Sequence, residues 1–217
     1  MPDLEELFLA YSQKKSEIKK RLTWFERVWE NGGNKRIFSE LCFCILTPQS
    51  GAFACDAAIK RCLPGGAIFF GNQKELESRI FPVRFYKNKS KYIIEARNFF
   101  SNSKKIMIKD LLSEQNMQLN QKHAREWLVK NVKGLGYKEA SHFIRNIGFG
   151  KGLCILDRHV LKNLKRLGVI KSLPKTLPRK KYFEIEEKML AFSKKIGIPA
   201  EELDLLLWSQ QTGVVFK

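Results

Sequence analysis

The chain has 217 residues, and its 40 Lys and Arg against 22 Asp and Glu give a formal net charge of +18 at pH 7. A hydrophobic fraction of 44% is ordinary for a folded protein, so we expect one compact unit rather than a disordered chain. No apolar run approaches the roughly 18 residues that a membrane-spanning helix requires. Acidic residues near the start argue against a secretion signal, and we expect a cytoplasmic protein.

The excess of basic side chains is the first feature that bears on function. A large net charge causes self-repulsion, which a polyanionic partner relieves, so nucleic acid is the expected partner. The alternative is a solvated, lysine-rich surface of the kind found in thermophile proteins, in which Glu would increase together with Lys. Because acidic residues do not match the basic ones in number, the composition favours binding to nucleic acid.

The cysteines indicate neither a disulfide framework nor a metal site. They are Cys42, Cys44, Cys55, Cys62 and Cys154. An odd number in a chain expected in a reducing compartment argues against structural disulfides. The sequence has no CxxC pair and only three histidines, so we expect no zinc site.

Apolar residues recur at helical spacing almost throughout the chain. The expected helices lie near 3–30, 36–46, 51–62, 73–80, 89–101, 121–132, 137–148, 158–167, 180–196 and 200–210. Glycines and prolines separate them, and alternating strand patterns are nearly absent. The sequence therefore predicts an all-α protein of about ten helices, without internal repeats.

Residues 123–150 contain Gly134-Leu135-Gly136 between two amphipathic stretches. Both glycines are expected to allow positive φ and close approach of another backbone, while Leu135 anchors the turn in the core. The helix that follows would offer free N–H groups and a positive dipole end to a phosphate, with Lys133 nearby. We interpret this segment as a helix-hairpin-helix that binds the DNA backbone without reading sequence. An ordinary turn after a helix C-cap is the alternative.

Two residues after the second glycine, Lys138 occupies the first turn of the new helix. The helix dipole disfavours a cation there, and partial burial would further favour the neutral amine. A neutral amine can attack the anomeric carbon of an extruded nucleotide, displace the base and form a Schiff base, from which elimination breaks the strand. We predict that Lys138 is the nucleophile; a phosphate-binding lysine is the alternative.

Asp157 follows Lys138 by 157 − 138 = 19 residues and stands between an apolar run and a helical stretch. Its position predicts a helix N-cap. A carboxylate there would also stabilise positive charge on the sugar and assist proton movement from Lys138. The two roles are compatible, because capping fixes the direction of the carboxylate.

Several stretches together resemble the helix-hairpin-helix DNA glycosylase superfamily. VKGLGYKEASHFIRNIG followed by ILDRH is similar to the family's hairpin, catalytic Lys and Asp. CILTPQSGAFACDAAI resembles the segment that enters the duplex, and RFYKNKSKYIIEARNFF resembles the Gly-, Tyr- and Lys-rich helix, with Phe in place of Gly. The resemblance implies two helical lobes around a DNA-binding cleft, one of about 36–150 and one formed by 1–35 with 151–217.

The absence of C-terminal cysteines and the presence of a lysine after the hairpin indicate which branch of the superfamily the chain resembles. No cysteine follows Cys154, so the iron–sulfur cluster of endonuclease III-like relatives is not expected. The presence of Lys138 distinguishes the chain from alkylation-repair relatives. What remains resembles the compact archaeal and bacterial 8-oxoguanine DNA glycosylase/AP lyases, whose ending is similar to LLLWSQQTGVVFK. We expect no cofactor, and whether a monovalent cation binds the hairpin is left open.

The resemblance also suggests how the base is recognised. Phe85 and Trp208 would sandwich the extruded base, each stack being worth about 1–3 kcal/mol, although either could simply belong to the core. The α-carboxylate of Lys217 would accept a hydrogen bond from N7–H, which 8-oxoguanine has and guanine lacks. Gln49 would fill the vacated stack and contact the orphaned cytosine; a solvent-facing turn residue is the alternative.

The expected partner is therefore double-stranded DNA containing oxidised guanine, bound by a monomer associated with the nucleoid. A related alternative is a glycosylase/lyase for oxidised pyrimidines. The alternative from a different class is a DNA-binding protein without catalytic activity, in which Lys138 only holds phosphate.

Overall fold

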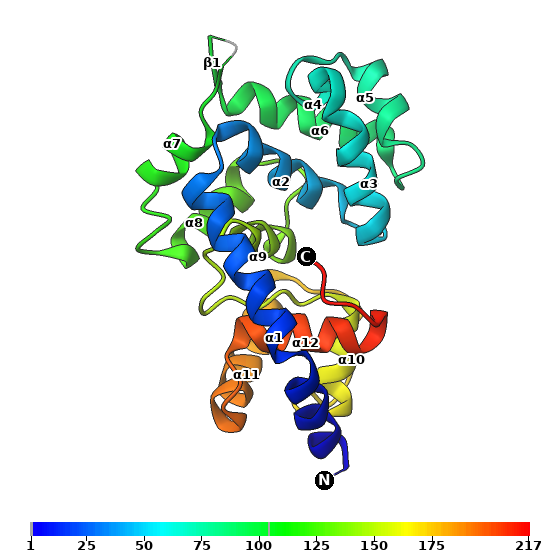
Figure 1. Cartoon of the computed structure of the whole chain (residues 1–217), viewed down its shortest axis with the longest axis vertical. Helices are drawn as coiled ribbons and strands as arrows, with labels where there is room; N and C mark the ends of the chain where they lie inside the picture. Colours follow the sequence, from blue (N-terminus) through cyan, green and yellow to red (C-terminus); the bar gives the residue numbers. More distant parts are fainter. Residues whose placement is uncertain (1, 104) are drawn as a thin grey trace.

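Helices form nearly all the regular structure of the computed structural model, which describes residues 2–103 and 105–217 (Figure 1). The first six are α1 (Pro2–Asn31), α2 (Asn34–Leu46), α3 (Ala52–Cys62), α4 (Ala67–Phe70), α5 (Gln73–Ile80) and α6 (Tyr86–Phe99). The other six are α7 (Ile108–Glu114), α8 (Gln121–Asn131), α9 (Tyr137–Asn146), α10 (Arg158–Arg166), α11 (Arg179–Ile196) and α12 (Ala200–Thr212). The predicted all-α fold is confirmed.

The elements absent from the sequence prediction are all short. Helices α4 and α7 and the 3₁₀ turn η1 (Pro64–Gly66) span at most seven residues each, too few for an apolar stripe to repeat. The strands β1 (Ser101–Asn102) and β2 (Lys105–Ile106) pair antiparallel, with Ser101 opposite Ile106. They form a small hairpin between α6 and α7 and leave the helical architecture unchanged.

Buried apolar side chains form two clusters. The first contains residues of α2 to α9 together with Val28 and Trp29 of α1. The second contains residues of α10, α11 and α12 together with Phe25 and earlier residues of α1. Helix α1 thus contributes to both clusters, and Figure 1 shows it running from the N-terminal end of the molecule across its middle. The division into lobes stays a prediction.

Two buried ion pairs connect the hairpin helices with the C-terminal helices. The guanidinium of Arg125 in α8 donates two hydrogen bonds to Glu186 in α11, of 2.6 and 2.8 Å. Arg145 in α9 donates to Asp204 in α12 at 2.7 Å. Removing one partner of such a pair leaves an uncompensated buried charge, so the pairs restrict how α8 and α9 can move against α11 and α12.

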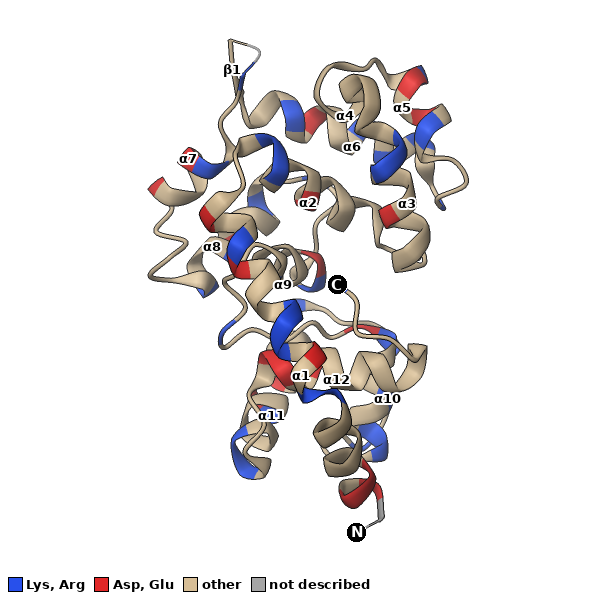
Figure 2. Ribbon diagram, viewed as in Figure 1, with Lys and Arg blue, Asp and Glu red and all other residues tan. Residues whose placement is uncertain are grey.

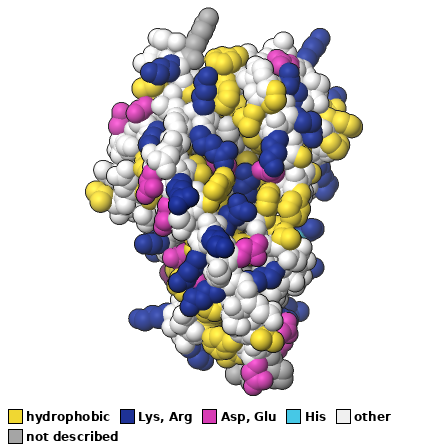
Figure 3. Space-filling model, viewed as in Figure 1, with side chains coloured by type: hydrophobic (Ala, Val, Ile, Leu, Met, Phe, Trp, Pro, Cys, Tyr) yellow, Lys and Arg dark blue, Asp and Glu magenta, His cyan; other side chains and the backbone are white. Residues whose placement is uncertain are grey.

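Basic residues lie on helices throughout the molecule rather than in one segment (Figure 2). On the face seen in Figure 3, Lys and Arg side chains outnumber acidic ones and extend across its middle. Of the helices in the described part of the chain, none combines the length and apolarity needed to cross a bilayer.

Candidate active site

The turn between α8 and α9 has the conformation that its glycines allow. Gly134 has φ +90°, and a Cβ at this position would come within 2.6 Å of the Tyr92 ring. Leu135 is only 6% exposed and belongs to the first apolar cluster. Lys133 is exposed beside the turn, with its ammonium 3.3 Å from Glu95. The turn is thus anchored by a buried leucine and has an exposed lysine beside it.

The prediction of positive φ at both glycines is wrong for Gly136. Its φ is −95° and its ψ −175°, an extended conformation that other residues also adopt. Its N–H donates to Glu139 Oε2 at 3.2 Å, and a Cβ would lie 3.1 Å from that oxygen. At Gly136 the absent side chain leaves room for the Glu139 carboxylate, which satisfies a free N–H group at the start of α9.

Lys138 projects from the first turn of α9, and its side chain is 22% exposed. Its ammonium lies 2.7 Å from Glu139 Oε1 and donates to the Thr47 hydroxyl at 3.4 Å. The Glu139 carboxylate therefore does two things: one oxygen caps the hairpin and the other pairs with the lysine. Glu139 compensates the unfavourable position of a cation at a helix N-terminus. The sequence analysis missed this role, although Glu three residues after an N-cap is a known signal.

Asp157 is the N-cap of α10. Its Oδ1 accepts hydrogen bonds from the N–H groups of His159 and Val160, both of 2.8 Å. These bonds fix the direction of the carboxylate at the end of a buried apolar segment, Leu153 to Leu156. Because both bonds use the same oxygen, the second oxygen is available to a substrate.

Lys138 and Asp157 line the same cleft, which has a volume of about 690 Å³. Its walls come from the α2–α3 connection, the first turns of α9 and α10, residues 174–177 and α12. Gln49, Trp208 and Lys217 also line it. Residues distant in the chain are thus brought together around one space large enough for a nucleoside-sized ligand.

Phe85 does not line this cleft; the neighbouring Arg84 does. Phe85 is 49% exposed, precedes α6 and has φ +59°. The Arg84 guanidinium lies over its ring, 4.8 Å from the centroid. The structure therefore places the other predicted recognition residues at the cleft but leaves Phe85 at its margin.

The end of the chain is docked at the cleft. Trp208 stacks with Phe216 at a centroid separation of 6.2 Å, and Val215 is buried. The side chain of Lys217 is 8% exposed, with its ammonium 2.8 Å from Asp56 and 3.3 Å from Glu40. Carboxylates of α2 and α3 thus hold the ammonium of Lys217 and attach the end of the chain to these two helices.

His142, one turn after Lys138, was not singled out in the sequence analysis. It lines the cleft, although only 7% of its surface is exposed. Burial lowers the pKa of His142 well below 6.5, and the nearby charges of Arg145 and Lys138 lower it further. A neutral imidazole thus faces the site. Its helical position, four residues after the predicted nucleophile Lys138, is the signal that could have identified it.

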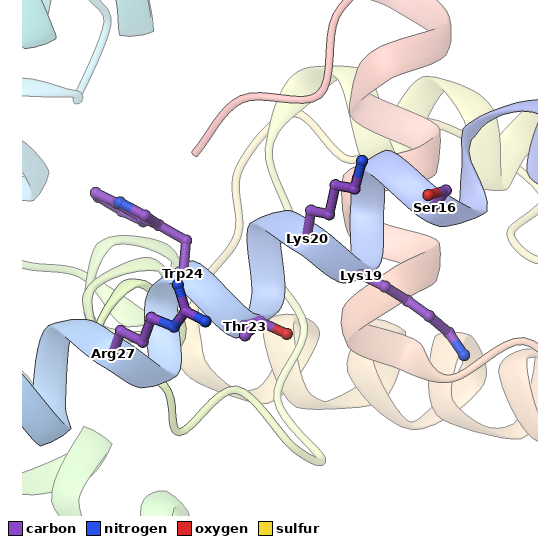
Figure 4. Close-up of a pocket in the computed structure, with 6 residues that line it drawn as sticks. All are labelled: Ser16, Lys19, Lys20, Thr23, Trp24 and Arg27. Atoms are coloured by element: carbon purple, nitrogen blue, oxygen red, sulfur yellow. The ribbon is translucent and has the colours of Figure 1, made fainter.

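A second hollow, of about 440 Å³, lies along one helix, α1 (Figure 4). Its lining residues are Ser16, Lys19, Lys20, Thr23, Trp24 and Arg27. This set contains no carboxylate that could act with a lysine nucleophile. Nor does any group of His, Cys, Asp and Glu among the described residues have an arrangement suited to a metal ion.

The family model for 8-oxoguanine DNA glycosylase with a helix-hairpin-helix matches residues 18–198. The chain belongs to this family. It is 48% identical over 212 residues to the 8-oxoguanine DNA glycosylase/AP lyase of Fusobacterium nucleatum subsp. nucleatum, a match covering 98% of this chain and 96% of that relative. The family that the hairpin motif, Lys138 and Asp157 indicated is confirmed.

Solved structures of the family have the same fold. The Methanocaldococcus jannaschii 8-oxoguanine glycosylase/lyase, in complex with a 15mer DNA containing 8-oxoguanine, superimposes with a TM-score of 0.88 at 37% identity and full coverage of both chains. The Thermotoga maritima 8-oxoguanine DNA glycosylase gives a TM-score of 0.85 at 33% identity, covering 99% of this chain and 98% of that one.

Proposed function

We propose that this chain excises 8-oxoguanine from double-stranded DNA and cleaves the resulting abasic strand. The observation that carries the proposal is the presence of Lys138 and Asp157 in one cleft beside the helix-hairpin-helix turn. Full-length relatives named 8-oxoguanine DNA glycosylase/AP lyase support it. They favour oxidised guanine over oxidised pyrimidines, and they argue against a DNA-binding protein without catalytic activity.

In the proposed reaction the neutral amine of Lys138 attacks C1′ of the extruded nucleotide. A bond forms between Nζ and C1′ while the glycosidic bond breaks, and the base leaves with its bonding electrons and takes up a proton. Ring opening gives a Schiff base between Lys138 and the sugar. Loss of a C2′ proton then expels the 3′ phosphate, which breaks the strand. Glu139, 2.7 Å from the ammonium, is positioned to accept the proton that Lys138 must lose.

Asp157 acts in the first of these steps. Positive charge develops on the sugar as the base leaves, and a carboxylate of fixed orientation stabilises that charge. The capping bonds from His159 and Val160 provide the fixed orientation, since they hold Oδ1 at 2.8 Å from both N–H groups. Capping and catalysis thus use different oxygens of the same group.

Recognition of the base involves the other residues of the cleft. Trp208 offers one stacking surface, and Phe85 would complete a sandwich by moving from the cleft margin towards the base. Lys217 contributes to the purine-reading part of the cleft, and Gln49 contacts the strand opposite the lesion. Gly134, Leu135 and Gly136 form the phosphate-binding turn, with Lys133 beside it. The chemistry uses side chains of this chain, and whether a monovalent cation binds the hairpin stays open. The monomeric state and the association with the nucleoid stay predictions.

Borohydride trapping tests the catalytic assignment. Wild-type protein incubated with an 8-oxoguanine duplex should give a covalent protein–DNA adduct, because borohydride reduces the Schiff base. Lys138→Gln should give none, whereas Lys122→Gln, which changes an exposed lysine of α8, should trap like the wild type. Asp157→Asn should slow base release by about 100-fold or more, the range typical of losing one group that stabilises transition-state charge.

Two results would overturn the assignment. An undiminished adduct with Lys138→Gln would mean that another amine is the nucleophile. Absence of an adduct with wild-type protein across a panel of oxidised purines and pyrimidines would leave only the DNA-binding alternative. A preference for oxidised pyrimidines would keep the mechanism and change the substrate.

A further inference from the structure

Lys89 is a buried lysine in a chain whose lysines are mostly on the surface. It belongs to α6, and its exposed fraction is 3%. Its ammonium donates hydrogen bonds to the carbonyl oxygens of Leu46 and Pro48, both of 2.7 Å, and to the hydroxyl of Ser50 at 3.0 Å. All three donors of the ammonium are therefore used.

These three acceptors lie on one segment, the connection between α2 and α3. Leu46 is the last residue of α2, where carbonyl oxygens lack helical partners and a cation is favourable. Burial lowers the pKa of Lys89 to about 8, so keeping an ammonium there has an energetic cost. A single side chain thus satisfies a helix end and the turn that follows it.

The segment held by Lys89 forms one wall of the catalytic cleft. Thr47 accepts a hydrogen bond from Lys138, and Gln49 is exposed at its tip. Gln49 has φ +54°, a conformation that a non-glycine residue keeps only when its surroundings impose it. The Ser50 N–H closes this turn on the carbonyl of Thr47 at 3.0 Å, and Lys89 fastens the closed turn to α6 through Pro48 and Ser50, on either side of Gln49.

We propose that Lys89 is a positioning residue for base extrusion, which holds the α2–α3 connection so that Gln49 can enter the space the lesion leaves. The inference rests on the proposed function. It extends the site to a residue that does not touch the DNA and acts through Gln49. The ammonium is required because neutral side chains of similar length lack three donors.

Substrates that do or do not require extrusion separate this role from a structural one. A duplex with 8-oxoguanine opposite cytosine requires extrusion, whereas a single-stranded oligonucleotide with a preformed abasic site does not. Lys89→Met should lower the single-turnover rate of excision from the duplex at least tenfold. Trapping on the single strand should change less than twofold, because the nearer partner of Lys138 is Glu139 at 2.7 Å, on α9 itself, whereas Thr47 of the held segment is 3.4 Å away. Lys74→Met, at an exposed lysine of α5, should change neither.

A mutant cycle tests whether Lys89 acts through Gln49. Gln49→Ala combined with Lys89→Met should lose no more duplex activity than the larger single loss. Should Lys89→Met fold poorly, Ser50→Ala removes one acceptor and should give a smaller loss confined to the duplex. Equal loss on both substrates, multiplicative losses in the cycle, or full duplex activity of Lys89→Met would overturn the proposal. Inactive wild-type protein would instead contradict the proposed function.

Discussion

Lys138 shows how a single side chain depends on its immediate neighbours. A cation in the first turn of a helix is opposed by the helix dipole. Here the next residue compensates it, because the Glu139 carboxylate pairs with the ammonium at 2.7 Å. The same carboxylate accepts a hydrogen bond from the N–H of Gly136. Lys138, the proposed nucleophile, and the hairpin turn are therefore joined through one acidic side chain, and replacing Glu139 would affect both.

His142 carries a prediction at this scale. Its pKa in the folded protein lies well below 6.5, so below that pH the unfolded chain binds a proton that the folded protein does not. The free energy of unfolding should therefore fall with decreasing pH, by up to about 1.4 kcal/mol per unit from this residue. The part of the stability that depends on a neutral His142 is fully present above pH 6.5 and is lost as the pH falls below that value.

Urea unfolding of the wild type and His142→Gln at pH 7, 6 and 5 measures this contribution. The variant should lose less stability than the wild type between pH 6 and 5. His123→Gln, at an exposed histidine of α8, is the control and should follow the wild type. Parallel pH profiles for all three proteins would show that His142 titrates normally.

At the level of elements, the hairpin is determined by backbone conformation and close packing. Gly134 combines φ +90° with close packing against the Tyr92 ring of α6, which a Cβ at this position would meet at 2.6 Å. The turn thus depends on a helix from another part of the chain. Gly136 has the extended conformation usual for an N-cap residue, and the Glu139 carboxylate accepts a hydrogen bond from its N–H.

Gly134→Ala should therefore weaken both the fold and DNA binding. A left-handed conformation costs an alanine about 1–2 kcal/mol, and its Cβ would come 2.6 Å from the Tyr92 ring. We expect the free energy of unfolding to fall by at least that amount and the dissociation constant for duplex DNA to rise several-fold, as measured by urea unfolding and fluorescence anisotropy. Gly33→Ala is the control, because a Cβ there meets nothing within 4 Å. Unaltered DNA affinity in Gly134→Ala would show that the turn does not contact the backbone.

For the whole molecule, the dominant property is charge. A net charge of +18, with basic side chains on most helices (Figure 2), predicts that affinity for DNA comes largely from phosphate contacts and release of counterions. We expect the cleft to provide selectivity and the surrounding surface to provide much of the binding free energy.

The dissociation constant for an undamaged duplex should accordingly rise at least tenfold between 50 and 200 mM salt. Lys133→Gln should lower the slope of the log–log plot by about one, as expected for the loss of one phosphate contact. Fluorescence anisotropy across a salt series measures both. A flat profile would contradict phosphate-dominated binding, and an unchanged slope in Lys133→Gln would remove that residue from the interface.

The longer helices and the family follow from local patterns in the sequence, which also predict Lys138 and Asp157 as the catalytic pair. Apolar spacing predicts the longer helices, and the glycines predict the hairpin. The separation of Lys138 from Asp157 follows a family motif. Short helices such as α4 and α7 were not predicted, because an apolar repeat cannot be recognised in so few residues. The lobe boundaries stay predictions.

Tertiary packing brings residues from distant segments of the chain into one site. The pairing of Lys217 with Asp56, the position of His142 in the cleft wall and the bonds from Lys89 to the α2–α3 connection all join residues far apart in the chain. No periodicity or spacing encodes such contacts, because they depend on how helices pack. The exposed position of Phe85, at the cleft margin rather than in its wall, was decided in the same way.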